Sequence, residues 1–246
     1  MPTLTLAIET SNPSSSTSPA PGVALGVLHG PSSPPEVLGI EPLRPTSRHH
    51  DDLAGAIDRV LRRCGHRASE LRRVAISRGP GGYTSLRIAV ATAKMICFAA
   101  GAECVSVDTA VALARRIAER QDTPVQGNDE PCVAVALAGK EDSAWISILR
   151  GRATARAGLV DAAGLRAFLR PDLDCPAAFI ADRFLPLAMR EEVSRLGIRL
   201  AEPRFDPVAV LEAAAASDPI PTDELEPLYP RPPEAVTLWK ARHPRR

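Results

Sequence analysis

GPGGYTSLR, at residues Gly79–Arg87, leaves the apolar strand Val74–Ser77 and enters a helix that runs to about Ala100. Three glycines and a proline within four residues are costly to order unless the backbone needs that shape. Glycine adopts positive φ and allows close approach of other atoms, whereas proline fixes φ. Thr84 and Ser85 can cap the helix and leave amide groups aimed outward. The pattern predicts a tight strand-to-helix turn that either holds an anion or packs against a neighbouring segment.

The helix after this turn carries small residues at four-residue steps, namely Ala89, Ala93 and Cys97. Small residues in a row permit close approach of a second helix. Two interpretations remain open at this point. Either the helix is buried inside its own domain, or the row forms a subunit interface that Arg87 and Lys94 could rim.

Few other segments indicate chemistry. The glycine run is neither a P-loop nor a Rossmann fingerprint, because both spacings are absent and no lysine follows the glycines. Glu9-Thr10-Ser11 ends the first predicted strand, where an acid beside hydroxyls can hold a metal–phosphate group or cap a turn. His49 and His50 lack metal-ligand spacing, and no nucleophile-and-base arrangement is found.

Composition excludes several classes of protein. The chain has 246 residues, 45% of them hydrophobic, which is enough for one large domain or two small ones. The net charge of +1 gives no overall field for nucleic acid or membrane, and 4% aromatic residues is too few for a base-stacking surface. Five cysteines without a CxxC motif predict reduced, mostly buried thiols. With neither a signal peptide nor a membrane span evident, we expect a cytoplasmic protein without membrane contact.

Periodicity predicts two α/β lobes. The expected strands are 3–9, 22–28, 37–43, 74–77, 104–107, 132–138, 143–150 and 177–181, and the expected helices are 49–64, 85–100, 110–120, 161–169, 185–196 and 207–217. We expect an N-terminal lobe at 1–120, a C-terminal lobe at 121–220, and a proline-rich extended tail with a basic end at 221–246.

Several segments together resemble the bacterial TsaB (YeaZ) family. Ile8–Ser11 resembles its first-strand signature, and His49 resembles its early histidine. Gly79–Arg87 resembles its glycine signature, usually GPGS(F/Y)TGLR, and Glu226–Arg231 resembles its closing Pro-x-Tyr-x-Arg segment. The order and spacing of these segments hold over nearly the whole chain.

The resemblance implies an α/β protein with the actin/Hsp70-like (ASKHA) fold, in which two ribonuclease-H-like lobes carry mixed central sheets. It implies a non-catalytic dimerization subunit that pairs with a TsaD-like catalytic subunit for threonylcarbamoyl transfer to adenosine 37 of tRNA. A TsaE-like ATPase would complete the assembly, the chain would form a homodimer when alone, and tRNA contact would be indirect. No cofactor or metal is expected, apart from ATP or ADP with Mg²⁺ at a partner interface.

The resemblance also assigns residues. Pairing would use two N-terminal helices, with candidate interface side chains Leu53, Ile57, Leu61, Leu86, Ala89, Val90, Ala93 and Cys97. The signature loop comprises Gly79, Pro80, Gly81, Gly82, Tyr83, Thr84 and Arg87. Candidate nucleotide-binding residues are Glu9, Thr10 and Ser11.

The chain departs from the family pattern in three places. Gly82 and Ser85 stand where the family has serine and its second glycine, Ala138–Lys140 replaces Asp-Ala-Arg, and Asn12–Pro21 lengthens a phosphate-contacting loop. These departures weaken the case for nucleotide hydrolysis. The alternative function is an ATP-binding ATPase or phosphotransferase of the same superfold that uses Glu9 and the glycine turn. A third candidate function, a protease that acts on glycoproteins, is not supported by any metal-ligand or nucleophile arrangement in the sequence.

Overall fold

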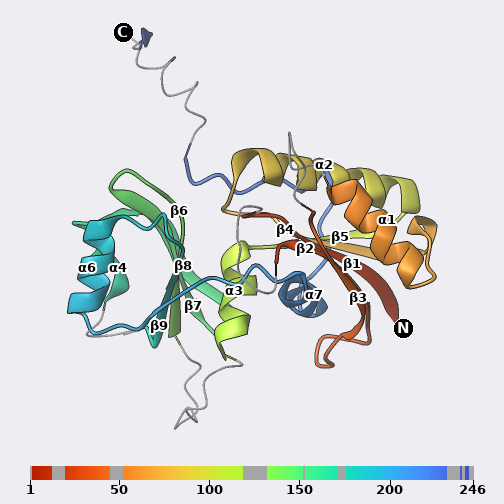
Figure 1. Ribbon diagram of the computed structural model, residues 1–246, viewed down its shortest axis with the longest axis horizontal. Coiled ribbons are helices and arrows are strands. Elements are labelled where there is room, and N and C mark those ends of the chain that lie inside the picture. Colours follow the sequence, from red (N-terminus) through yellow and green to blue (C-terminus); the bar gives the residue numbers. More distant parts are fainter. Residues whose placement is uncertain are drawn as a thin grey trace.

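The computed structural model describes residues 2–12, 20–44, 52–118, 132–151, 153–170, 176–231, 239, 242 and 243. His49, His50, Cys175 and most of the Ser/Pro-rich loop lie outside these residues. The described chain forms two five-stranded sheets with helices on their faces (Figure 1). The two-lobed α/β architecture predicted from the sequence is therefore confirmed.

The first sheet is mixed. Its spatial order is β3 (Glu36–Pro42), β2 (Gly22–Leu28), β1 (Thr3–Glu9), β4 (Arg73–Ser77) and β5 (Glu103–Val107). β1 runs antiparallel to β2 and parallel to β4. Helices α1 (Leu53–Arg63) and α2 (Tyr83–Ala100) cover one face, and α7 (Pro207–Ala215) lies on the other (Figure 1). Successive side chains of β1 point to opposite faces of the sheet. Leu6 and Ile8 pack in the core with α1 and α2, whereas Ala7 packs in the core with α7.

The second sheet is also mixed. Its order is β10 (Leu200–Ala201), β9 (Ala178–Ala181), β6 (Cys132–Lys140), β7 (Ser143–Arg150) and β8 (Ala153–Asp161). Helices α4 (Leu165–Leu169) and α6 (Leu187–Arg195) pack on one face. Helix α3 (Thr109–Ala118) packs on the other face, between the two sheets (Figure 1). Two short 3₁₀ turns, η1 (Ala68–Glu70) and η2 (Thr222–Glu224), complete the described elements.

The lobe boundaries differ from those predicted. Helix α7 falls in the predicted C-terminal lobe, yet it packs on the first sheet and against α3. Helix α3 falls in the predicted N-terminal lobe, yet Ala110 and Leu113 pack on the second sheet with Val133. The physical reason is that α7 is apolar on nearly every side and must be covered on more than one side. The chain therefore enters the second lobe at α3 and returns to the first at α7.

Two further features bear on the predictions. Cys64, Cys97 and Cys104 are free thiols, and Cys97, Cys104 and Cys132 are buried. Among the described residues, no helix combines the length and apolar character that crossing a bilayer requires.

Candidate functional site

The signature loop follows β4 and packs on the segment that follows β1. The Gly82 amide donates to the Ser11 carbonyl at 2.7 Å, and the Thr109 amide donates to the Gly79 carbonyl at 2.9 Å. A Cβ on Gly81 would lie 2.3 Å from the Ser11 carbonyl oxygen, and Gly79 has a φ of +115°. The glycines are thus needed for close packing of chain segments, which is the second interpretation offered by the sequence.

The start of α2 differs from the prediction. Gly82, rather than Thr84 or Ser85, is the N-cap residue, and no side chain caps the helix. The Ser85 hydroxyl donates back to the Gly82 carbonyl at 2.9 Å. Arg87 lies one turn further and donates to the Tyr83 hydroxyl at 3.3 Å. The exposed first turn therefore presents an aromatic ring and a guanidinium group beside uncapped amides.

Glu9, Thr10 and Ser11 are buried at the end of β1. The Ser11 amide and hydroxyl donate to Glu9 Oε1 at 2.7 and 2.6 Å. Glu9 Oε2 and the Thr10 hydroxyl have no hydrogen-bond partner among the described residues. Burial is the largest influence and raises the pKa of Glu9, while hydrogen bonds from Ser11 and Ser77 oppose it. The carboxyl group is thus directed into the protein interior.

A small cavity of about 210 Å³ lies between the lobes. Its described lining consists of Ser11, Asn12, Pro80, Gly81, Gly82, Leu137, Ala138, Gly139, Asp182, Phe184 and Phe205. The second lobe closes tightly here, since a Cβ on Gly139 would lie 2.3 Å from the Phe184 carbonyl oxygen. Burial raises the pKa of Asp182.

The described residues that line this cavity do not fit ATP with Mg²⁺. Ligand pockets commonly measure about 300–1,000 Å³, which exceeds the volume available here. The described lining contains neither lysine nor arginine to balance phosphate charge, and neither Glu9 nor Thr10 belongs to it. Within the described ranges, no group of three acidic, histidine or cysteine side chains could hold a metal ion.

The eight predicted interface side chains do not form an outward surface. All are buried, with exposed fractions between 0 and 7%, and all except Leu86 pack in the core of the first lobe. Ala89, Ala93 and Cys97 face the sheet, where their small size lets α2 approach the strands closely. The assignment of these side chains to a partner interface is therefore wrong, because the fold itself occupies them.

The opposite face of α2 is exposed and apolar. Phe98 is 86% exposed and Met95 is 65% exposed. Between α2 and η1 lies an open groove lined by Ala68, Ser69, Ala91, Thr92, Met95, Ile96, Ala99 and Ala100. We call Ala91, Met95 and Phe98, with this groove, the outer face of α2. Sequence reasoning missed it, although the large apolar residues Met95 and Phe98, which lie off the row of small residues, were the available signal.

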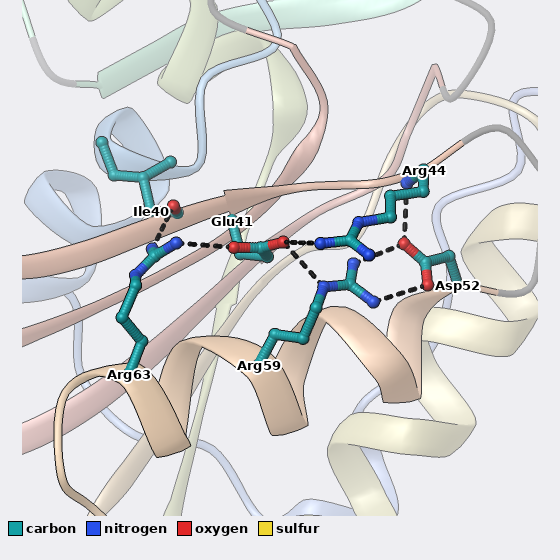
Figure 2. A network of polar contacts seen from close by, with 6 residues as sticks. All are labelled: Ile40, Glu41, Arg44, Asp52, Arg59 and Arg63. Carbon is teal, nitrogen blue, oxygen red and sulfur yellow. Dashed lines mark hydrogen bonds and ion pairs between the residues drawn. The ribbon is translucent and has the colours of Figure 1, made fainter.

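A network of charged side chains fixes α1 against β3 (Figure 2). Arg59 donates to Glu41 at 2.7 Å and makes a bidentate pair with Asp52 at 3.0 and 2.6 Å. Arg63 donates to the other oxygen of Glu41 at 2.8 Å, and the Arg44 amide donates to Asp52 at 2.7 Å. The hydrogen bonds from Arg59 are the largest influence and lower the pKa of both carboxyl groups. The network therefore holds α1 in a fixed position against β3.

Comparisons with known proteins agree with this fold. The family model of TsaD, tRNA N6-adenosine threonylcarbamoyltransferase, matches residues 31–169, which is more than half of the chain. No curated protein matches the sequence. YeaZ from Pseudomonas aeruginosa superposes with a TM-score of 0.61 at 18% identity and covers 92% of this chain and 99% of its own.

A second solved structure, an uncharacterized protein from Pseudomonas aeruginosa with similarity to peptidase YEAZ, gives a TM-score of 0.59 at 18% identity. It covers 93% of this chain and 100% of its own. At this identity the two structures establish the fold and nothing finer. The predicted two-lobed architecture is confirmed, and the resemblance to the TsaB (YeaZ) proteins agrees with their shared fold. The chain belongs to the TsaD family and has the fold of the YeaZ (TsaB) proteins.

Proposed function

We propose that the chain is a non-catalytic scaffold subunit that pairs with a TsaD-like catalytic subunit for threonylcarbamoyl transfer to adenosine 37 of tRNA. Family membership and the glycine signature support this function. The observation that carries it is the outer face of α2, where Met95 and Phe98 lie exposed on a helix whose inner face is fully packed.

The outer face has the chemistry of a protein–protein contact. Met and Phe are enriched at the cores of such contacts, where one or two large apolar side chains supply most of the binding energy. The flanking groove contains Ala91, Thr92 and Ala99, whose small side chains leave room for a partner's side chain. The packed inner face keeps the helix rigid, so that little ordering is needed on binding.

The remaining parts of the proposal follow from this pairing. The scaffold holds the catalytic subunit in its active shape, and tRNA is contacted by that subunit. A TsaE-like ATPase joins the assembly, and the same outer face pairs two copies of this chain when no partner is present. Any ATP or ADP is held at a partner interface, because the described lining of the cavity between the lobes does not fit it.

The test is reconstitution with the TsaD-like protein from the same host. Light scattering on the purified mixture should show a stable complex. Addition of the TsaE-like ATPase, threonylcarbamoyl donor and tRNA should give modified adenosine by mass spectrometry, at a rate that depends on this chain. The proposal is contradicted if the chain does not bind the TsaD-like protein. It is also contradicted if the catalytic subunit is equally active without this chain.

Calorimetry with ATP and Mg²⁺ distinguishes the alternative ATPase or phosphotransferase. The scaffold proposal predicts that the isolated chain shows neither tight binding nor turnover. Micromolar binding with turnover that Glu9→Ala abolishes would establish the enzyme instead.

A further inference from the structure

The segment from Ile220 to Arg231, here called the strap, crosses the first lobe after α7 and ends on the second (Figure 1). It starts beside β5, where the Ile220 amide donates to the Cys104 carbonyl at 2.8 Å. Leu225 is fully buried in the core under α1 and α2. Lys94 of α2 donates to the Asp223 carbonyl at 3.0 Å. The strap is therefore part of the first lobe over its first half.

The middle of the strap supports the signature loop and the first turn of α2. The Leu228 amide donates to the Arg78 carbonyl at 2.8 Å, and a Cβ on Gly79 would lie 2.9 Å from the Leu228 carbonyl oxygen. The Tyr229 ring lies 4.8 Å from the Tyr83 ring, centroid to centroid. The Arg87 guanidinium lies over the Tyr83 ring, with its central carbon 5.4 Å from the ring centroid.

The last residue of the strap is bound to the second lobe. Arg231 donates to the Ala138 carbonyl at 2.5 Å and to both the carbonyl and the hydroxyl of Ser143 at 2.9 Å. These acceptors lie on β6 and β7, on either side of the turn that joins the two strands. A guanidinium with three such acceptors has strong, directional hydrogen bonds that a lysine cannot reproduce. Arg231 thus joins the second lobe to Tyr229, two residues earlier.

We propose that the strap couples the position of the second lobe to the outer face of α2, with Arg231 as the positioning residue and the contact between the Tyr229 and Tyr83 rings as the link. This inference rests on the proposed pairing function. Partner binding at α2 would depend on Arg231 although Arg231 lies on the other lobe. A coupling of this kind commonly changes affinity by roughly fivefold to 150-fold.

The chain is well suited to a direct test, because Tyr83 and Tyr229 are its two tyrosines and Met95 is one of its three methionines. NMR with labelled tyrosine rings and methionine methyl groups reports the contact between the two rings, the outer face and the second-lobe core, where Met189 is buried. Arg231→Ala should shift both tyrosines and Met95, leave Met189 unchanged, and weaken binding of the TsaD-like protein by at least about fivefold. Arg231→Lys should give a smaller change of the same kind.

Arg195→Ala is the matched control, since it removes an exposed arginine from α6 that pairs only with acids of its own helix among the described residues. It should change none of these signals. The coupling is overturned if Arg231→Ala leaves the tyrosine signals in place, or moves them without affecting Met95 and partner affinity. If the unmodified chain does not bind the TsaD-like protein, the proposed function fails. The tyrosine and Met95 shifts of the free chain then still decide whether the strap couples the lobes.

Discussion

The two faces of α2 are both apolar but differ completely in what covers them. Ala89 and Ala93 on the inner face are fully buried against the first sheet, and Leu86, one turn earlier, is also fully buried. Met95 and Phe98 on the outer face are exposed. Small residues at four-residue steps therefore mark the contact between helix and sheet here, and the surface that we propose for a partner lies on the opposite side of the same helix.

The largest expected effect is on the inner face. Leu86→Ala should lower the free energy of unfolding by about 2–5 kcal/mol, because it leaves a cavity in a packed core. Denaturant titration followed by circular dichroism measures the change. A loss below about 0.5 kcal/mol, the range of an ordinary surface substitution, would show that the inner face is not a packed core.

On helix α1, an arginine in a partly buried network can be compared with an arginine in an exposed ion pair. Arg59→Ala removes the paired hydrogen bonds to Glu41 and Asp52, whereas Arg62→Ala removes one exposed pair with Asp58. Thermal denaturation should show a clear loss for Arg59→Ala, smaller than that for Leu86→Ala. The matched Arg62→Ala should change stability by about 0–1 kcal/mol. Equal effects of the two variants would contradict a structural role of the network.

The Arg59 contribution should also depend on pH. Its hydrogen bonds lower the pKa of Glu41 and Asp52 below their ordinary values of 4.5 and 3.8. Stability from such groups is present above the unfolded pKa and is lost as the pH falls through the folded pKa. The difference between wild type and Arg59→Ala should therefore shrink below about pH 4. A difference that grows on acidification would show that the carboxylates are not stabilised by Arg59.

Glu9 should respond to pH in the opposite direction. Burial raises its pKa, so the stability from its neutral form is complete below the ordinary value of 4.5 and is lost as the pH rises through the folded pKa. The neutral Glu9→Gln should exceed wild type by about 1 kcal/mol at pH 8, and the two should converge near pH 4. Urea titrations at both pH values measure this. A less stable Glu9→Gln at pH 8 would show that the charged form is satisfied in the folded protein.

The smallest effect on folding is expected at the outer face. Phe98→Ala should change the free energy of unfolding by no more than about 0.5 kcal/mol, because the ring has few neighbours to lose. Differential scanning calorimetry on the isolated chain at low concentration checks this. A large loss would mean that Phe98 belongs to the core and is not available to a partner.

Much of the fold could be predicted from the sequence. The run Gly79–Gly82 marks a turn from strand to helix, and strict apolar runs such as Gly22–Leu28 mark buried strands. β8 was missed because it is an edge strand whose small and polar residues are largely exposed and lack a clear apolar alternation. The lobe that α7 joins was missed because an alanine-rich helix carries no information about which sheet will cover it.

The site could be predicted only in part. The structure brings Ser11, Gly81 and Gly82 together, as expected for segments that end adjacent parallel strands. The interface could not be placed, because period 3.6 identifies the two faces of α2 without saying which one the sheet covers. The contacts of Arg231 join residues about ninety positions apart, and no local pattern reports such a contact.

The most direct test of pairing through α2 compares an arginine introduced on the outer face of α2 with an arginine introduced on the second lobe. Phe98→Arg should abolish the complex with the TsaD-like protein in light scattering while the chain stays folded. Leu187→Arg, at a 71% exposed position of α6, should leave the complex intact. A complex that survives Phe98→Arg, or that is lost equally in both variants, would contradict pairing through α2.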